Sequence, residues 1–230
     1  MCGRYALTAA EKILLALFGY VPGEAEPFPP RYNIAPTQPI ATVRQEHGER
    51  HFALVRWGLV PAWVEDPKQF SLIINARREG IMEKPAYKYA MRYRRCLVPA
   101  SGFYEWRKGP GKTRQPFWIP PKDGGVIAFA GLWETWHPKD GGEIDSGCIV
   151  TVPANDTLAP IHDRMPAVIA PDHFETWLTG EPEEANALLK PAANDLLATI
   201  QVSDRVNKAD NDDPGLIEPV TPMKSDLFSA

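Results

Sequence analysis

The sequence predicts an α+β fold: a single domain of mostly antiparallel β-sheets that form a barrel-like core with a few flanking helices. Short apolar runs alternate with turn residues along most of the chain, a pattern typical of β-hairpins. The 24 prolines are scattered between these runs, which suits strand ends and loops. With 230 residues, 44% of them hydrophobic, the chain can bury one substantial core. We therefore expect residues 1–230 to form one domain.

The elements are expected in the following order. A capping box from Thr8 to Glu11 predicts a helix that runs through Phe18, and residues 19–38 are expected to be loop. Apolar runs on either side of Gly-containing turns then predict hairpins that pair residues 40–44 with 52–57, 96–106 with 116–119, and 126–136 with 148–152. A short strand is expected at 167–170, followed by helices at 172–178 and 183–190.

Charge is unevenly distributed along the chain. Residues 1–120 carry 18 Lys/Arg against 10 Asp/Glu, and residues 121–230 carry 7 against 19, so the net charge is −4. This asymmetry allows a basic face on a mildly acidic protein. No apolar run approaches the roughly 20 residues of a membrane helix, and the N-terminus lacks a signal-peptide pattern. We expect a soluble, cytoplasmic protein that does not bind membranes.

The cysteine and histidine patterns disfavour metal and disulfide sites. Cys2, Cys96 and Cys148 are odd in number and contain no CxxC pair, which argues against a disulfide framework or a structural zinc. His47 and His51 flank a polar turn and are expected at the surface. We therefore expect no metal and no cofactor.

Cys2 is the first candidate for chemistry. Cysteine is small enough to allow removal of Met1, which would leave an α-amine beside the thiol. An α-amine with a pKa of about 7.7–8.0 is partly unprotonated at neutral pH, and a thiol near 8.5 is a thiolate to a few per cent. The amine can form a Schiff base with an aldehyde, and the thiol can then close a thiazolidine ring. Position alone weighs this equally against a small buried residue at a chain end.

Three more polar residues lie among apolar ones. Asn75 follows the apolar run at 70–74, Glu105 lies between Tyr104 and Trp106, and His162 lies in a proline-bounded loop. Aromatic surroundings raise the pKa of a carboxyl group toward the range of a general acid. Each residue also has a structural interpretation: a satisfied hydrogen bond for Asn75, an ion pair for Glu105 and a loop position for His162.

Aromatic and basic residues are interleaved in the first half of the chain, a combination that suits single-stranded DNA binding. The residues concerned are Trp57, Trp63, Tyr87, Tyr89, Tyr93 and Trp106 with Arg56, Lys88, Arg92, Arg94 and Arg95. A β core with a charged outer face is expected to account for most of the aromatic residues.

Several strings in combination resemble the SOS-response-associated peptidase (SRAP) family. They are MCGRY at the start, RYNIAPTQ at 31–38, RWGLVPAW at 56–63, NAR at 75–77, RRCLVPASGFYEW at 94–106, AGLWE at 130–134, APIHDRMP at 159–166 and VSDRVNKADND at 202–212. The chain departs from the family's common patterns at Gly80 and in the segment Thr151–Asn155.

The resemblance implies a sensor of abasic sites in single-stranded DNA that forms a stable DNA–protein crosslink. It implies that Cys2 forms the crosslink, Asn75 holds the opened sugar, Glu105 transfers protons and supports self-processing, and His162 handles Schiff-base protons and crosslink reversal. It also implies a DNA channel, in which we expect Arg77, Arg164, Pro36, Trp63, Arg4 and Thr151 to contact the strand.

Two other functions stay open on the sequence. The first is an amidohydrolase or peptidase with Cys2 as N-terminal nucleophile and with Glu105 and His162 as its acid–base pair. The second is a non-catalytic single-stranded DNA-binding module. A weak abasic-site lyase activity is also expected, because an unfinished Schiff base can undergo β-elimination. We expect a monomer whose partner is DNA that contains abasic sites.

Overall fold

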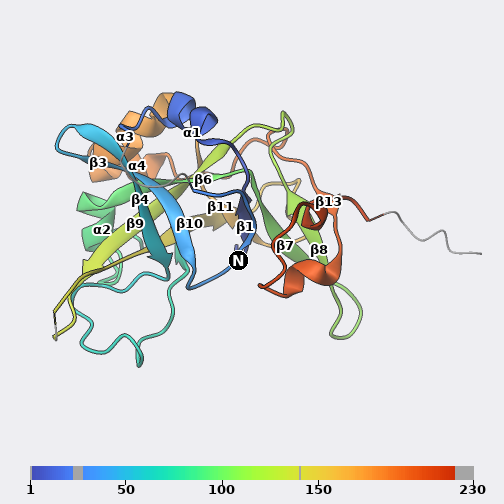
Figure 1. The fold of residues 1–230 in the computed structure, drawn as a ribbon, viewed down its shortest axis with the longest axis horizontal. Helices are drawn as coiled ribbons and strands as arrows, with labels where there is room; N and C mark the ends of the chain where they lie inside the picture. The colour runs from blue at the N-terminus through green and yellow to red at the C-terminus, as the bar shows by residue number, and fades with distance from the viewer. Residues whose placement is uncertain (1, 23–27, 140, 221–230) are drawn as a thin grey trace, which may run out of the picture.

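The strands form two sheets, and the larger sheet closes into a barrel (Figure 1). The computed structural model describes residues 2–22, 28–139 and 141–220. The closed ring consists, in hydrogen-bonded order, of β3 (Pro39–Glu46), β4 (Glu49–Trp57), β10 (Ile144–Pro153), β9 (Ile127–Trp136) and β6 (Arg95–Ala100), which pairs back to β3. The β4–β10 pair is parallel and the other pairs of the ring are antiparallel. The predicted α+β fold and barrel-like core are therefore confirmed.

Short strands extend the barrel where the candidate site lies. β5 (Asn75–Arg77) pairs in parallel with the second half of β10, and β11 (Arg164–Pro166) pairs antiparallel with its end. β12 (Val168–Ile169) pairs with β9. These pairings bring residues 75–77 and 164–166, which are distant in the sequence, to the same end of β10.

The smaller sheet has the order β13 (Ile200–Gln201), β8 (Arg114–Ile119), β7 (Gly102–Lys108), β1 (Tyr5–Leu7) and β2 (Arg31–Ile34). One residue, Ser101, separates β6 of the barrel from β7 of this sheet. Gly102 makes the change possible, because its φ is +154° and a Cβ there would lie 2.6 Å from the Trp118 ring. A larger residue at this position would clash with Trp118 and with the carbonyl of Ile119 on β8, and would force β7 away from β8.

Short helices cover one side of the barrel (Figure 1). They are α1 (Glu11–Phe18), α2 (Lys88–Tyr93), α3 (Phe174–Thr179) and α4 (Pro182–Ala187), with the 3-10 turns η1 (Pro171–His173), η2 (Asp204–Asn207) and η3 (Pro214–Leu216). The rings of Phe18 and Phe174 stack with centroids 5.2 Å apart, which holds α1 against α3. Within the described residues, no helix has the length and apolar character needed to cross a membrane.

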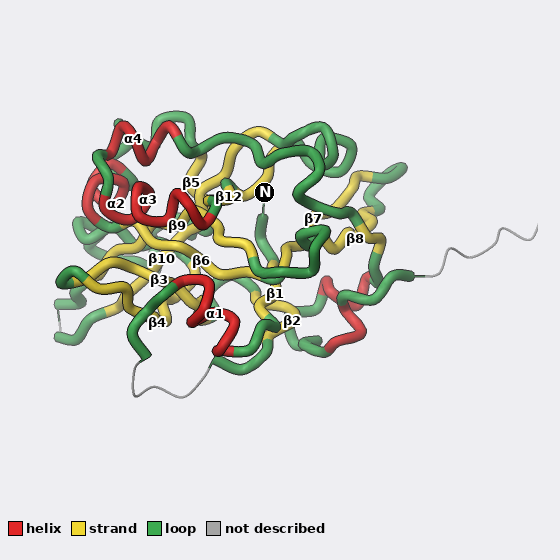
Figure 2. Tube along the Cα trace, turned by 90° about the horizontal axis from the view of Figure 1, so that it is seen from above, coloured by secondary structure: helices red, strands yellow, loops and turns green. Residues whose placement is uncertain are grey.

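The core places the start of the chain between the two sheets. Tyr5 is fully buried, and its ring packs edge-on against Trp57 and Phe129 at centroid distances of 5.5 and 6.2 Å. Figure 2 shows the segment that leads into β1 lying between the barrel strands and the β7–β8 hairpin. Aromatic packing at Tyr5 thus fixes the strand that follows Cys2.

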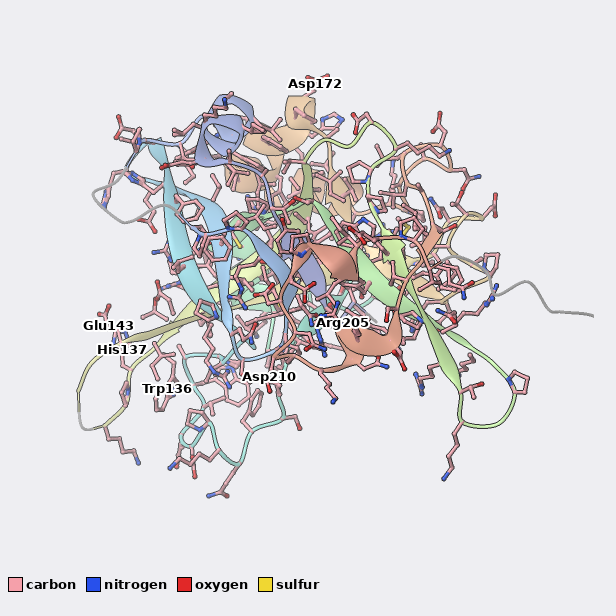
Figure 3. All side chains as sticks on the ribbon, turned by 45° about the vertical axis from the view of Figure 1, so that its right-hand side comes forward. Trp136, His137, Glu143, Asp172, Arg205 and Asp210 are labelled. Atoms are coloured by element: carbon pink, nitrogen blue, oxygen red, sulfur yellow. The ribbon has the colours of Figure 1, made fainter. Side chains whose placement is uncertain are left out.

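The hairpins predicted at 40–57 and 126–152 are confirmed. At the end of the second hairpin, Trp136, His137 and Glu143 lie close together (Figure 3), and His137 is 3.8 Å from Glu143. The predicted pairing of 96–106 with 116–119 is confirmed only for β7, because Gly102 divides the run between two sheets.

Three other expectations need correction. The Thr8 capping box is wrong: Ala10 is the N-cap of α1, and the Thr8 hydroxyl hydrogen-bonds with Ser101 across the sheet junction. The expected loop at 19–38 contains β2, because residues 31–34 pair with β1; residues 23–27 of that loop lie outside the described residues. The last predicted helix starts at Pro182 and ends at Ala187, and α2 had no prediction.

Candidate active site

The N-terminal segment is held from both sheets. The Asn75 side-chain amide, on β5 of the barrel, donates a hydrogen bond of 2.8 Å to the carbonyl oxygen of Cys2. On the other side, the backbone N–H of Tyr104 on β7 donates to the carbonyl oxygen of Arg4 at 2.9 Å. Since Glu105 follows Tyr104, this antiparallel register carries Glu105 toward the residues that precede Arg4.

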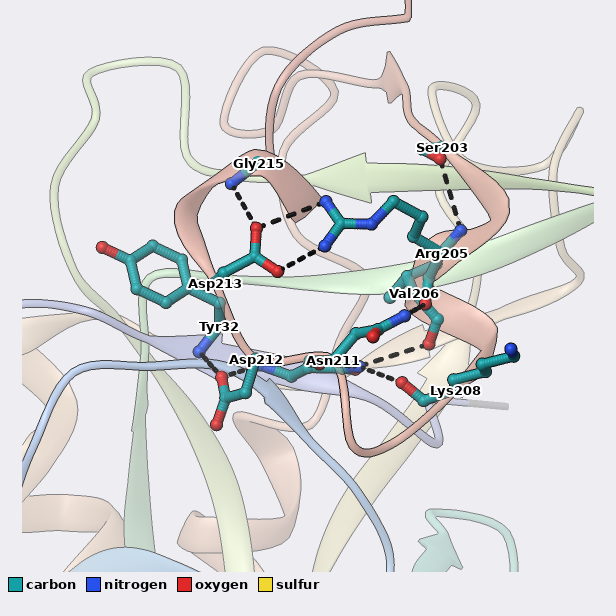
Figure 4. Close-up of polar contacts among 10 residues, drawn as sticks. Tyr32, Ser203, Arg205, Val206, Lys208, Asn211, Asp212, Asp213 and Gly215 are labelled. Carbon is teal, nitrogen blue, oxygen red and sulfur yellow. Dashed lines mark hydrogen bonds and ion pairs between the residues drawn. The ribbon is translucent and has the colours of Figure 1, made fainter.

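A C-terminal clasp, residues 203–217, is closed by its own polar contacts and bonds to the backbone of Tyr32 in β2 (Figure 4). It also holds the N-terminal segment through Arg4. Arg4 donates to the side chain of Asn33 at 2.8 Å and to the carbonyl of Val206 at 2.6 Å. Asn33 in turn donates to clasp carbonyls, and Asp212 accepts the backbone N–H groups of Tyr32 and Asn33 at 2.5 and 3.0 Å. The structure thus assigns the Arg4 guanidinium to this clasp, and DNA contact by Arg4 stays a prediction.

The Cys2 thiol is protonated in this environment. Cys2 is fully buried, and burial, followed by the charge of Glu105, raises the pKa of its thiol far above its ordinary value. The prediction that a few per cent of the Cys2 thiol is ionised at neutral pH is therefore wrong for the protein without substrate. A buried and protonated thiol is a weak nucleophile.

Glu105 has the protonation behaviour of a general acid near neutral pH. Its side chain is 2% exposed on β7. Burial raises the pKa of Glu105 to about 7, against the opposing influence of the amino-terminal charge of the chain. The expectation that apolar surroundings would raise this pKa is confirmed. A carboxyl group with this pKa can both donate and accept a proton at physiological pH.

His162 is neutral at pH 7 and has a defined tautomer. The backbone N–H of Arg164 donates to Nδ1 of His162 at 3.0 Å, which leaves the proton on Nε2. Asp163 Oδ1 also lies 3.0 Å from Nδ1, a contact that would need a protonated Nδ1. Burial, and then the amino-terminal charge, lowers the pKa of His162, and this favours the neutral ring over the ion pair.

The predicted catalytic residues form one electrostatic cluster. Glu105 contributes to the raised pKa of Cys2, and Asp163, the neighbour of His162, contributes to the raised pKa of Glu105. Asn75 completes the group through Cys2. The Oδ1 atom of Asn75 is buried and has no hydrogen-bond partner among the described residues.

The predicted DNA-contacting residues fall into two groups. Arg77, at the end of β5, and Trp63, which is 58% exposed, present their side chains to solvent, and Pro36 is half-buried after β2. Arg164 is buried and forms a bidentate ion pair with Glu79 at 2.8 and 3.0 Å. It also donates to Thr151, which is fully buried.

Three residues that shape the site were not predicted from the sequence: Glu79, Asn33 and Asp163. Glu79 is the acid that follows Arg77 and Arg78, Asn33 lies in the RYNIAPTQ string, and Asp163 adjoins His162. An acid next to bases or next to a histidine is a usable signal for a partner, whereas the role of Asn33 depends on the distant clasp.

Comparison with known proteins decides the family. The model of the family described as SOS response associated peptidase (SRAP) matches residues 1–209. The chain belongs to the SRAP family. The resemblance noted in the sequence is thereby confirmed over nearly its whole length.

Relatives of this SRAP chain carry names that refer to abasic sites. The abasic site processing protein YoqW of Bacillus subtilis is 36% identical over 224 residues, which cover 95% of this chain and 99% of the relative. The abasic site processing protein YedK of Escherichia coli is 32% identical, with 96% and 100% covered. A crystal structure of a Bacteroides thetaiotaomicron protein matches with a TM-score of 0.86 at 25% identity and covers 96% of this chain and all of the other.

Among the residues described, no group of three or more His, Cys, Asp or Glu is placed to hold a metal ion, and the three cysteines are free and buried. Cys96 and Cys148 lie in the barrel core. Cys2 is the cysteine that meets the acid–base residues.

Proposed function

We propose that this SRAP protein captures abasic sites in single-stranded DNA as a covalent thiazolidine on Cys2, after removal of Met1. The observation that carries the proposal is the convergence of Cys2, Asn75, Glu105 and His162 at the junction of the two sheets. The names of the relatives, abasic site processing proteins, support the same substrate.

The mechanism follows from the protonation states. Protonated Glu105 delivers a proton to the ring oxygen of the abasic deoxyribose, which opens to the aldehyde. The Cys2 amine attacks C1′, and loss of one water gives a Schiff base. The Cys2 thiol then adds to C1′, and its proton moves to the nitrogen, so the ring closes with the net loss of that one water. Asn75 Oδ1 accepts from a sugar hydroxyl and holds the opened sugar.

His162 supports the reverse direction. A neutral imidazole whose pKa is lowered can accept and return protons at the Schiff base without holding them. Reopening needs a proton on the thiolate that leaves C1′ and reactivation of the imine. A Schiff base that does not close to the thiazolidine can undergo β-elimination, which gives a weak lyase activity. Glu105 also serves self-processing of the chain.

Two other functions are weighed against this one. A peptidase would use Cys2 as its nucleophile, but the raised pKa of the thiol disfavours attack by a thiolate. A binding module that performs no chemistry has no use for a buried carboxyl group with a pKa of about 7 beside Cys2. The binding module also has no role for the α-amine.

We infer that the protein acts as a monomer in the cytoplasm, where the DNA is, and prefers single strands. Exposed Arg77 and Trp63 and half-buried Pro36 are the surface groups that support this preference. The test of the function is a denaturing gel after incubation with a single-stranded oligonucleotide that contains one abasic site. A DNA-shifted protein band supports capture, and cleavage of a peptide without any shifted band supports the peptidase.

The two arginines expected to bind phosphates should behave differently. Arg77→Ala should weaken binding to undamaged and abasic strands alike and reduce the slope of log K against log salt by about 0.7, because one phosphate contact is lost. Arg164→Ala should instead lower the free energy of unfolding by about 1–3 kcal/mol, because the buried hydrogen bonds to Thr151 are lost. Salt titrations and denaturant unfolding of both variants check this. An unchanged salt slope for Arg77→Ala would remove that arginine from the DNA channel.

A further inference from the structure

Three exposed aromatic side chains lie outside the cluster around Cys2. Trp63, Tyr89 and Tyr93 have exposed fractions of 58%, 51% and 64%, respectively. The aromatic residues that the sequence interleaves with basic ones are therefore partly buried and partly exposed in the folded protein. Trp57 is fully buried, as a core role predicts, whereas these three rings remain at the surface. Exposed rings in such a number need an explanation, because burying them would be favourable.

These rings line two adjoining hollows along α2, which together we call the α2 groove. Its first part is lined by Trp63, Pro85, Lys88 and Tyr89, and its second part by Lys88, Tyr89, Arg92 and Tyr93. Lys88 and Tyr89 belong to both parts, so the two hollows adjoin along α2. The groove consists of flat rings with basic side chains between them.

The rings are held in place rather than loose. The indole N–H of Trp63 donates to the carbonyl of Pro85 at 3.4 Å, and its ring packs edge-on against Phe70 at a centroid distance of 5.6 Å. The rings of Tyr89 and Tyr93 lie 5.0 Å apart, and the guanidinium of Arg92 lies 5.9 Å from the Tyr93 centroid. Preorganised rings lose little conformational entropy when another flat group stacks on them.

The charge of the groove favours an anionic partner. Residues 77–95 contain seven Lys/Arg and two Asp/Glu. One of those acids, Glu79, is paired with Arg164. Lys88 and Arg92 are exposed and form no ion pair with any residue that the structure describes. Of the acids that line the groove, Glu134 is 3.1 Å from Arg94, which leaves Glu183.

The chain itself connects the α2 groove to the candidate active site. β5 carries Asn75 and Arg77 of the site, and the segment 78–87 runs directly from it to α2. Trp63 lies on the loop between β4 and β5 and lines the groove at its first part. Trp63 and Tyr89 therefore line the same hollow.

We propose that the α2 groove binds the unpaired bases that flank the abasic nucleotide on one side, stacking them on Tyr89 and Tyr93. This inference rests on the proposed function, and it extends the footprint on the strand by several nucleotides. Every base offers a flat face, so stacking on tyrosine binds any sequence, and Lys88 and Arg92 neutralise the accompanying phosphates. A protein partner would make less use of exposed rings flanked by basic side chains that form no ion pair with a described residue.

The test compares strand lengths in a double variant and a matched control. Tyr89→Ala/Tyr93→Ala removes the stacking rings, and Tyr89→Phe/Tyr93→Phe keeps them. We measure the dissociation constants of a 25-nucleotide undamaged strand and a 5-nucleotide strand, and the crosslinking rate of both lengths with a central abasic site at subsaturating protein. Strands extended on one side only identify which side enters the groove. Thermal unfolding verifies that both variants fold.

The Ala variant should bind and capture the 25-nucleotide strand at least about tenfold more weakly, with little change on the 5-nucleotide strand, and the Phe variant should match wild type. Equal affinity of the Ala variant and wild type for the 25-nucleotide strand would overturn the proposal. Equal losses on both lengths would also overturn it, and so would a wild type that gains nothing from the longer strand, which would favour a protein partner. Binding of undamaged strands tests the groove even if wild type forms no crosslink, so the two failures are distinguishable.

Discussion

Cys2→Ala should abolish the heat-stable adduct with abasic single-stranded DNA. Alanine also permits removal of Met1 and keeps the α-amine, so attack on C1′ and loss of water still occur. Without the thiol, the reaction stops at the Schiff base, which hydrolyses on heating. Borohydride reduction before denaturation should recover a crosslinked band from Cys2→Ala, whereas wild type should show the band without reduction.

The matched control is Cys148→Ala, which removes a different buried thiol from the barrel core. This variant should form the adduct as wild type does, provided that it remains folded. An adduct of Cys2→Ala that withstands heating without borohydride would contradict the thiazolidine. If neither variant formed the adduct, the loss would reflect misfolding and not the missing Cys2 thiol.

Glu105→Gln should slow adduct formation by about 100-fold if proton delivery to the sugar is rate-limiting. Glutamine keeps the shape of the side chain but cannot deliver a carboxyl proton. The measurement is the single-turnover rate of adduct formation at constant temperature over pH 5.5–9. His162→Ala provides the comparison: it should slow formation less, and it should reduce transfer of a preformed adduct to a competing abasic strand.

The pH profile separates a general acid from a structural residue. The pKa of Glu105 is raised to about 7, so its acid form predominates below that pH and falls about tenfold per unit above it. The α-amine, with an ordinary pKa of about 7.7–8.0, becomes nucleophilic as pH rises. Wild type should therefore show a bell-shaped profile with its maximum between these values. Glu105→Gln should lose the descending limb, and a variant that keeps it would show that another group supplies the proton.

Short-range patterns in the sequence predicted much of the fold. The hairpins around residues 47–48 and 137–143 follow from apolar runs on both sides of a turn, and the structure contains both. The split of the run 96–106 could not be predicted, because it depends on the close approach of Trp118 to Gly102. Likewise, β2 forms where Asp212, 180 residues away, accepts the N–H of Tyr32.

The same distinction applies to the site. The residue types at Cys2, Glu105 and His162 made them candidates for chemistry, and the raised pKa of Glu105 was expected from its aromatic neighbours. The protonated state of Cys2 did not follow, because complete burial is a property of the folded protein. Likewise, only the structure shows that Arg164 forms an ion pair with Glu79, which distinguishes it from Arg77.

The most direct test is the intact mass of the protein after incubation with an abasic single-stranded oligonucleotide, followed by peptide mapping. The account predicts a species with the mass of the chain without Met1, plus the oligonucleotide, minus one water, with the modification on the peptide that begins at Cys2. An adduct on any other residue, an adduct on a chain that retains Met1, or no adduct from a processed and folded chain would contradict it.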